Sequence, residues 1–275
     1  MGKRSIITAA AALILTATVS SAAVVSFTSS VIAPTDTGTF LDNSGTVLSA
    51  VSFGQARSGT FTYNAPGTAS NPDPAPVLNG ITFVSTAGAI NPSGTYYALG
   101  QSGGGNMGYD NGRFSNVPNT NPGLFGLVYD VARSSANNIR LTLNVNSLTP
   151  GTIYQVQMIF SEINTADSGT TPADRSVQVA AGAFAVGANQ QVGTGADGTS
   201  AVYAYGPTSG ARVVTATFAA DSASEAFTFL SGTEGGNSRV SLAGVVISQI
   251  PEASTSMLAA AGVAAMAFSR RRKSA

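Results

Sequence analysis

Cysteine, histidine and tryptophan are all absent from this sequence of 275 residues. Without cysteine, a domain of this size has no disulfides and must depend on its hydrophobic core. Without histidine, the commonest general base and the commonest metal ligand are missing. These absences exclude catalysis by Ser-His and Cys-His nucleophilic sites.

Charged residues are also scarce, at 9% of the chain. Six of the thirteen cations lie at the two ends, at Lys3, Arg4 and Arg270 to Lys273. The middle of the chain keeps seven arginines against twelve acids, a net charge of about −5. A body with this balance has no basic stripe for phosphates, so we expect no nucleic-acid partner.

The N-terminus has the pattern of a secretory signal peptide. Lys3 and Arg4 precede an apolar run from Ile6 to Val19, and Ser21-Ala22-Ala23 supplies small residues for a signal peptidase. A transmembrane anchor is the alternative, but the run is short and ends in small residues. The sequence therefore predicts a signal peptide over residues 1–23 and export of the rest.

The C-terminus, residues 250–275, contains three successive parts: Pro251-Glu252-Ala253, an apolar run from Met257 to Phe268, and the cations Arg270, Arg271, Arg272 and Lys273. A helix over residues 255–269 would be roughly 22 Å long, shorter than a hydrocarbon core of about 30 Å. Its alanines and glycines contribute little to insertion. Transient membrane retention is favoured over a permanent anchor, with a helical hairpin or a core helix as the alternative.

These three parts resemble the PEP-CTERM sorting signal of Gram-negative bacteria, in which a Pro-Glu-Pro step precedes one apolar helix and a terminal Arg cluster. Ala253 stands where the signal has its second proline. The resemblance implies recognition of Pro251, Glu252 and Ala253 by an exosortase-type membrane protease, with Arg270 to Lys273 as a cytoplasmic stop. It implies removal of the tail and a place at the cell surface or outside the cell, after the C-terminal helix has first been held in the inner membrane.

Short runs rich in Val, Ile, Thr, Phe and Tyr recur between Gly, Asn, Pro and Ser through residues 24–249, and no comparable helical period is present. The predicted strands cover residues 24–28, 46–53, 60–63, 80–85, 95–99, 124–129, 139–145, 153–160, 176–180, 201–205, 212–218, 226–230 and 240–247. The chain is predicted to be all-β.

Two neighbouring strands predict how the sheets pack. Apolar residues alternate from Arg140 to Asn146, as in a strand with one face buried and one exposed. After it, Pro150 and Gly151 suit the centre of a type II turn. Tyr154 is placed to bond the corner backbone, as in a tyrosine corner, with simple strand packing as the preferred role. We expect one antiparallel, jelly-roll-like β-sandwich over residues 24–249, with tandem immunoglobulin-like domains as the alternative. The residues expected to face inward are Leu141, Leu143, Val145, Tyr154, Val156, Met158 and Phe160.

A broader resemblance covers most of this body. Its segments, in order, are Gly45 to Gly54, Val77 to Phe83, Leu148 to Phe160, Arg175-Ser176-Val177 and Leu242 to Ile247. Their succession resembles secreted PEP-CTERM proteins of planctomycete and verrucomicrobial type. The resemblance implies a β-sandwich body with no assigned activity.

The loop from Gly100 to Gly123 is the strongest candidate for a ligand site. Its three consecutive glycines are not followed by a Gly-Lys-Ser/Thr step, so the loop is not a P-loop. It does carry aromatic rings and planar polar groups of the kind that sugar sites use, with Tyr96 and Phe125 near its edges. A simple surface connection is the preferred interpretation of such a loop, and a glycan site is the alternative. The candidate glycan-binding residues are Tyr97, Tyr109, Asp110, Asn111, Arg113 and Phe114.

Acidic residues elsewhere suggest two further sites, each with an ordinary alternative. Asp42 to Gly45, Asp110 to Gly112 and Asp197-Gly198 have oxygens suited to Ca²⁺, but turn formation is the preferred interpretation, and no metal or cofactor is predicted. The carboxylates of a glycosidase could come from Glu162, Asp167 and Asp174. Ordinary loop acids, with Asp174 or Glu162 pairing Arg175, are the preferred interpretation.

Three functions are consistent with these features of the sequence. A non-catalytic cell-surface or extracellular-matrix protein accounts for both termini, the missing histidine and cysteine, and the sparse charge. A lectin-like module that binds exopolysaccharide is the alternative. A carboxylate-based polysaccharide hydrolase is the least favoured.

Overall fold

The structure is a computed structural model, and it describes residues 25–53, 60–62, 68–70, 76–86, 91–101, 108–111, 122–134, 140–161, 175–182, 200–205, 210–231 and 240–251. Within these residues the chain forms strands and one short helix, so the all-β prediction is confirmed. The elements are β1 (Ser26–Ile32), β2 (Thr46–Ser52), β3 (Thr60–Thr62), β4 (Thr68–Ser70), β5 (Val77–Leu78), β6 (Ile81–Thr82), β7 (Val84–Ser85), β8 (Tyr97–Gln101), β9 (Gly108–Asn111), α1 (Pro122–Tyr129), β10 (Asp130–Arg133), β11 (Leu141–Asn146), β12 (Ile153–Phe160), β13 (Arg175–Ala181), β14 (Ser200–Tyr205), β15 (Ala211–Ala219), β16 (Ser224–Ser231) and β17 (Ser241–Gln249).

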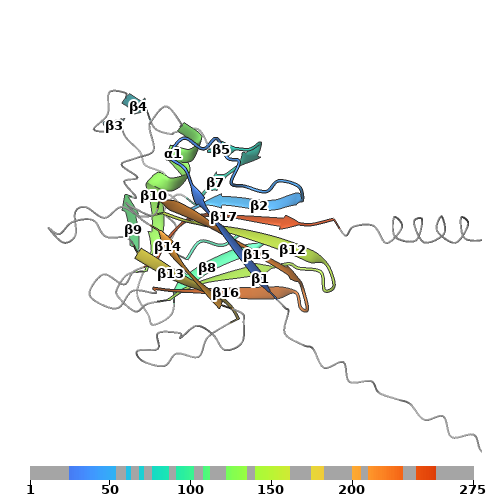
Figure 1. The fold of residues 1–275 in the computed structure, drawn as a ribbon. Helices are drawn as coiled ribbons and strands as arrows, with labels where there is room; N and C mark the ends of the chain where they lie inside the picture. Colours follow the sequence, from blue (N-terminus) through green and yellow to red (C-terminus); the bar gives the residue numbers. More distant parts are fainter. Residues whose placement is uncertain are drawn as a thin grey trace, which may run out of the picture.

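Two large sheets contain most of these strands (Figure 1). The five-stranded sheet has the order β14-β13-β16-β11-β8 and is antiparallel throughout. The eight-stranded sheet has the order β1-β15-β12-β17, and β17 then pairs with two strands along its far side. The start of β17 pairs with β10, which pairs with β9, and the rest of β17 pairs with β2. β7 adds to β2 in parallel, while β3-β4 and β5-β6 form separate small pairs.

The main core lies between the two large sheets. Burial along β11 alternates strictly, with Leu141, Leu143 and Val145 fully buried. All seven residues predicted to face inward belong to this core, three from the five-stranded sheet and four from the eight-stranded sheet. Aromatic rings pack across it, as in the edge-to-face contact of Phe160 with Phe229, whose ring centroids are 5.4 Å apart. The predicted inward faces are therefore confirmed.

A second core covers the opposite face of the eight-stranded sheet. It combines sheet residues such as Ile159, Val213 and Val246 with residues of α1 and of the β5-β6 hairpin. β12 and β17 are consequently buried on both faces. This explains the nearly continuous apolar run of β17 from Leu242 to Ile247. In β12, Gln155 and Gln157 alternate with apolar residues and bond to Asp42.

The helix α1 corrects the prediction of a strand over residues 124–129. Leu124, Leu127 and Val128 are all fully buried and follow i, i+3, i+4 spacing, so they lie on one helical face against the sheet. Pro122 is the first residue of the helix, a position that needs no backbone N–H. The strands β4, β5, β9 and β10 are two to four residues long and were not predicted from the sequence.

The predicted tyrosine corner is present between β11 and β12. Gly151 has φ of +85°, and the Thr152 N–H donates to the Thr149 carbonyl at 3.1 Å, which closes a turn of type II with Pro150 at its second position. The Tyr154 hydroxyl accepts a hydrogen bond from the Thr149 N–H at 3.0 Å. Because Tyr154 is 2% exposed, this bond fixes the corner from inside the core.

The two predicted targeting segments lie outside the described residues. These are the signal peptide over residues 1–23 and the tail from Glu252 onward. In the part of the chain that the structure describes, no helix is long and apolar enough to cross a membrane.

Candidate functional site

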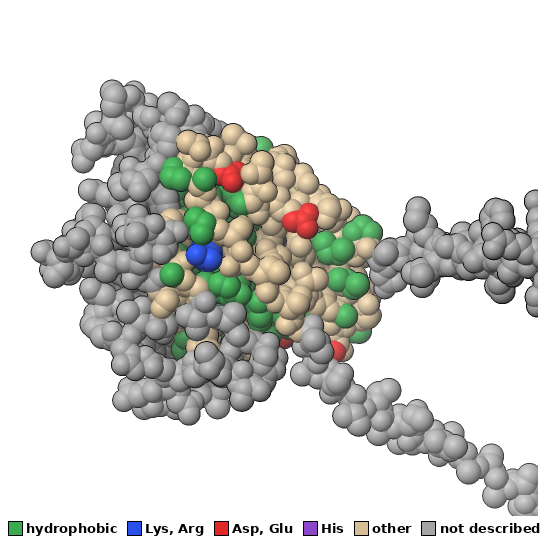
Figure 2. Space-filling model, in the orientation of Figure 1, with side chains coloured by type: hydrophobic (Ala, Val, Ile, Leu, Met, Phe, Trp, Pro, Cys, Tyr) green, Lys and Arg blue, Asp and Glu red, His purple; other side chains and the backbone are tan. Residues whose placement is uncertain are grey.

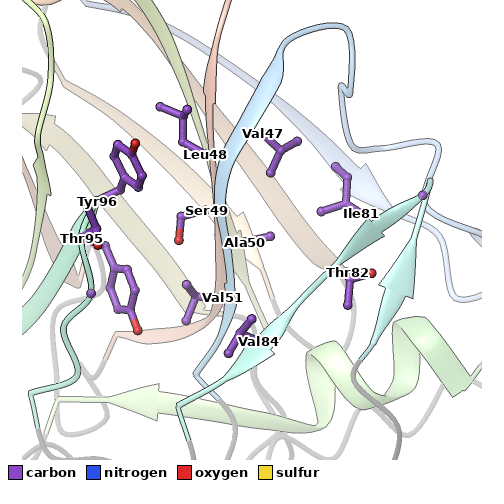
Figure 3. A pocket seen from close by; sticks show the side chains of 13 residues that line it. Val47, Leu48, Ser49, Ala50, Val51, Ile81, Thr82, Val84, Thr95 and Tyr96 are labelled. Carbon is purple, nitrogen blue, oxygen red and sulfur yellow. The ribbon is translucent and has the colours of Figure 1, made fainter.

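An open groove of about 530 Å³ runs along the outer side of β2, away from β17. Its walls come from β2, from the β6-β7 region and from the turn that leads into β8 (Figure 3). The lining residues are Val47, Leu48, Ser49, Ala50, Val51, Gly80, Ile81, Thr82, Val84, Gly94, Thr95, Tyr96 and Tyr97.

The groove lies astride β2 because this strand has a free edge over part of its length. β7 pairs with β2 at Val51 and Ser52, and among the described strands none pairs with the outer side of residues 46–49. Along β2, Leu48 and Ser49 both lie toward Tyr96, while Val47 and Ala50 lie toward Ile81 (Figure 3), so the side chains do not alternate strictly at this point. Leu48 is an extra residue in the pairing with β17, since Ser49 pairs with Ile247 and Val47 with Ser248. This β-bulge interrupts the regular edge of the strand.

The wall beyond Val47 is the β5-β6 hairpin, which is held by its turn. Asn79 and Gly80 have φ of +50° and +76°, as a two-residue hairpin turn requires. The Asn79 side-chain amide donates to the Leu41 carbonyl at 2.9 Å, and the Asn43 amide donates to the Asn79 carbonyl at 2.9 Å. The Asn-Gly pair is a sequence signal for this hairpin. The prediction of a strand over residues 80–85 did not use that signal and placed Gly80 in the strand instead of in the turn.

The opposite wall is the turn around Tyr96 and Tyr97. The Gly94 N–H donates to the Tyr97 carbonyl at 2.8 Å, and a Cβ on Gly94 would lie 2.7 Å from Cε1 of Tyr97. Tyr97 also meets Phe53 edge-to-face, with ring centroids 6.1 Å apart. Burial raises the pKa of the Tyr97 hydroxyl above its usual value. The Tyr97 ring is therefore fixed in place and its hydroxyl is uncharged at neutral pH.

The lining of the groove is uncharged. None of its thirteen residues is Asp, Glu, Lys or Arg. Six are aliphatic and two are tyrosines, and the hydroxyls of Ser49, Thr82 and Thr95 provide donors and acceptors among them. Charged groups are also sparse on the described surface seen in Figure 2, where uncharged side chains and backbone dominate. Val84, in the lining, is 67% exposed.

Of the predicted glycan-binding residues, Tyr97 lines the groove. Tyr109, Asp110 and Asn111 belong to β9, at an edge of the eight-stranded sheet, whereas Tyr97 starts β8, at an edge of the five-stranded sheet. Their side chains, and the whole of Arg113 and Phe114, lie outside the described residues. A single site shared by all six stays a prediction. The groove's other walls were missed because they come from sheet edges distant in sequence.

The Asp42 turn has the structure that the preferred interpretation predicts. The Ser44 N–H donates to Oδ1 of Asp42 at 2.9 Å, and Gln155 donates to Oδ2 at 3.1 Å. Hydrogen bonds from Ser44, and then from Gln155, hold the pKa of Asp42 below its usual value. Within the described ranges, no group of three or more acids is placed to hold a metal ion. The acids Glu162, Asp167 and Asp174 lie outside those ranges.

The C-terminal motif follows the folded body without a linker. β17 ends at Gln249, the Ile250 N–H donates to the Ile153 carbonyl at 2.9 Å, and Pro251 is exposed. The other predicted sorting residues, Glu252, Ala253 and Arg270 to Lys273, lie outside the described residues.

A family model described as the PEP-CTERM protein-sorting motif matches residues 249–273. The chain carries a PEP-CTERM sorting motif. The match supports an exported protein that an exosortase processes, with sorting at the membrane and delivery to the cell surface. It covers the tail, and it does not reach the body from which the planctomycete and verrucomicrobial resemblance was drawn.

The other comparisons give no family for the body. A comparison with curated proteins gives no match. Two solved structures are weakly similar, both variants of the exo-β-1,3-galactanase from Phanerochaete chrysosporium with β-1,3-galactotriose. Each has 15% identity and a TM-score of 0.29, and the match covers 60% of this chain and 32% of the galactanase. At that TM-score the similarity carries no argument about this chain.

Proposed function

We propose that the protein is a non-catalytic cell-surface or extracellular-matrix protein, exported by its signal peptide and sorted through its PEP-CTERM tail. The observation that carries this proposal is the sorting motif at residues 249–273, which begins at the last residue of β17. Signal peptidase removes residues 1–23, and the exosortase acts at Pro251-Glu252-Ala253. The C-terminal helix is in the inner membrane until that step, so membrane association is transient.

The strand pairing supports a single jelly-roll sandwich as the exported body. Eight strands, β2 and β11 to β17, pair first with last, second with last but one, and so on inward. The pairs are β2 with β17, β11 with β16, β12 with β15, and β13 with β14. This nested order, split between two sheets, is that of a jelly roll. Such a body presents surface without requiring a catalytic site.

The sorting proposal is tested by mass spectrometry of the exported protein from a host with an active exosortase. A mature chain that ends near Pro251 is expected, and a chain that still ends at Ala275 would refute the proposal. Replacing Glu252 should leave the tail in the membrane and uncut. Ala253→Pro should leave processing unchanged or improve it, because proline keeps the preceding segment extended.

The cationic cluster at Arg270 to Lys273 allows a separate test of the sorting proposal. With Arg270 to Lys273 neutralised, the short and weakly apolar run should pass through the membrane, because those charges resist translocation. The uncut protein would then be recovered outside the cell in soluble form. Neutralising Lys3 and Arg4 instead would act at the other end, on export itself, and serves as the comparison.

A lectin-like module for exopolysaccharide is the second candidate. The observation that favours it is the groove at β2, where Tyr97 and Tyr96 meet hydroxyl-bearing and apolar side chains. Sites of this kind, mostly apolar with a few polar groups, are typical for small ligands. A carboxylate-based hydrolase that uses Glu162, Asp167 or Asp174 is the least favoured, because no described geometry supports it.

A further inference from the structure

The lining of the groove along β2 suits one chemical class of ligand. We propose that it binds a neutral glycan chain in an extended conformation, an inference that rests on the lectin-like candidate above. Its volume of about 530 Å³ lies within the range of small-ligand sites, roughly 300–1,000 Å³. Three features of the groove favour such a ligand: the absence of charge in the lining, the placement of the tyrosines and the irregular edge of β2.

The absence of charge in the lining selects against acidic sugars. A uronate carboxylate that enters the groove loses hydration, and none of the thirteen lining residues offers a cation in return. Burial of an unpaired carboxylate is costly. A neutral sugar loses nothing comparable, because its hydroxyls can bond to Ser49, Thr82 and Thr95.

The tyrosines provide a rigid aromatic wall. Tyr97 is fixed by Phe53 and by the close approach of Gly94, and the Tyr96 carbonyl accepts a hydrogen bond from the Asn146 N–H at 2.9 Å. Tyrosine offers an apolar ring face and a polar hydroxyl in one side chain. The carbon-bound hydrogens of a sugar ring fit such a face, while the sugar hydroxyls meet the polar groups around it. Figure 3 shows Tyr96 and Ser49 on the same side of β2.

An added peptide strand is the competing occupant, and the edge of β2 disfavours it. Strand addition requires a regular row of free N–H and C=O groups. The bulge at Leu48 breaks that row, and β7 already occupies the edge at Val51 and Ser52. Bulges of this kind are a common protection against edge pairing. A glycan needs no such row.

Calorimetric titration of the full-length protein tests the proposal. The probes are neutral hexasaccharides of several linkages, among them cellohexaose and laminarihexaose, with hexagalacturonate as the acidic counterpart. At least one neutral probe should bind, and hexagalacturonate should bind at least about tenfold more weakly. Tyr96→Ala should weaken the neutral interaction by roughly fivefold or more, the loss of about 1 kcal/mol of aromatic contact.

Two matched controls separate binding from folding. Tyr203→Ala removes another half-buried tyrosine, on β14 at the opposite edge of the five-stranded sheet, and should leave affinity unchanged. Val84→Asp places a carboxylate in the groove and should abolish binding of the neutral probe. Val31→Asp makes the same change at a 51% exposed valine on β1 and should not affect it.

The outcomes distinguish the groove assignment from the lectin-like function on which it rests. Preferred binding of hexagalacturonate, or neutral binding that survives both Tyr96→Ala and Val84→Asp, would overturn the groove assignment and leave the lectin-like function standing. Binding of an uncharged extended peptide in place of every sugar would overturn both. Absence of any glycan binding would overturn both as well, and the sorting proposal would be untouched.

Discussion

The hydroxyl of Tyr154 offers the sharpest test of the fold. Tyr154→Phe removes one oxygen from a side chain that is 2% exposed. The Thr149 N–H loses its acceptor at 3.0 Å, while the ring keeps its packing on Phe218, whose centroid lies 6.1 Å away. The substitution therefore isolates one hydrogen bond from the hydrophobic contribution of the same residue.

The expected loss is about 1 kcal/mol of unfolding free energy, the usual net value of a neutral hydrogen bond. A larger penalty, up to about 3 kcal/mol, applies where the remaining partner is left buried and unpaired. Thr149 itself is exposed, so water can reach its N–H in the variant and the loss should stay near the lower value. The geometry of the turn, with Gly151 at φ of +85°, should be retained.

Urea denaturation of the two proteins measures this difference. With a slope of about 2–3 kcal/mol/M, the midpoint should fall by roughly 0.3–0.5 M while the slope stays constant. Tyr97→Phe is the control, because within the described part of the chain the Tyr97 hydroxyl has no hydrogen-bond partner. A shift for Tyr154→Phe no larger than that of the control would refute the role assigned to the corner.

Two other substitutions test packing and electrostatics. Gly244→Ala should destabilise by about 1–3 kcal/mol, because the added Cβ would lie 2.8 Å from both the Val51 carbonyl oxygen and Cδ1 of Leu127; Gly100→Ala, which meets nothing within 4 Å, should change the denaturation midpoint little. Burial, and then the nearby Asp221, raise the pKa of Glu225 above its ordinary value. Its ionised form thus opposes folding at neutral pH, and stability is regained as pH falls through the raised pKa. Glu225→Gln should therefore raise the denaturation midpoint at pH 7, and the gain should disappear below about pH 4, where the carboxyl is protonated in both states; an equal gain at both pH values would contradict this cause.

Local patterns in the sequence predicted most of the fold. Alternation from Arg140 to Asn146 identified β11 and its buried face, and Pro150-Gly151 with Tyr154 identified the corner, because both depend on nearby residues. The helix α1 was missed although Leu124, Leu127 and Val128 carry its spacing. In an apolar run this short, residue type favoured a strand, and burial against the sheet decided for a helix.

The groove shows where prediction from sequence ends. Tyr97 was identified because aromatic residues near a glycine-rich loop are a local signal. Leu48 and Val84 were not, because their role depends on which side of β2 is left free and on a bulge opposite β17. Those features follow from the order of strands in the sheet, which the local pattern does not contain.

The position of β17 limits when the eight-stranded sheet can be completed. A chain that leaves the cell from its N-terminus delivers β17 last, yet this strand pairs with β12 on one side and with β2 and β10 on the other. A chain that stops at Ser241 should remain open to protease, and one that reaches Pro251 should be protected. The sheet can thus be completed when the sorting motif reaches the membrane. The exosortase would then act on a body that has been fully exported and has folded.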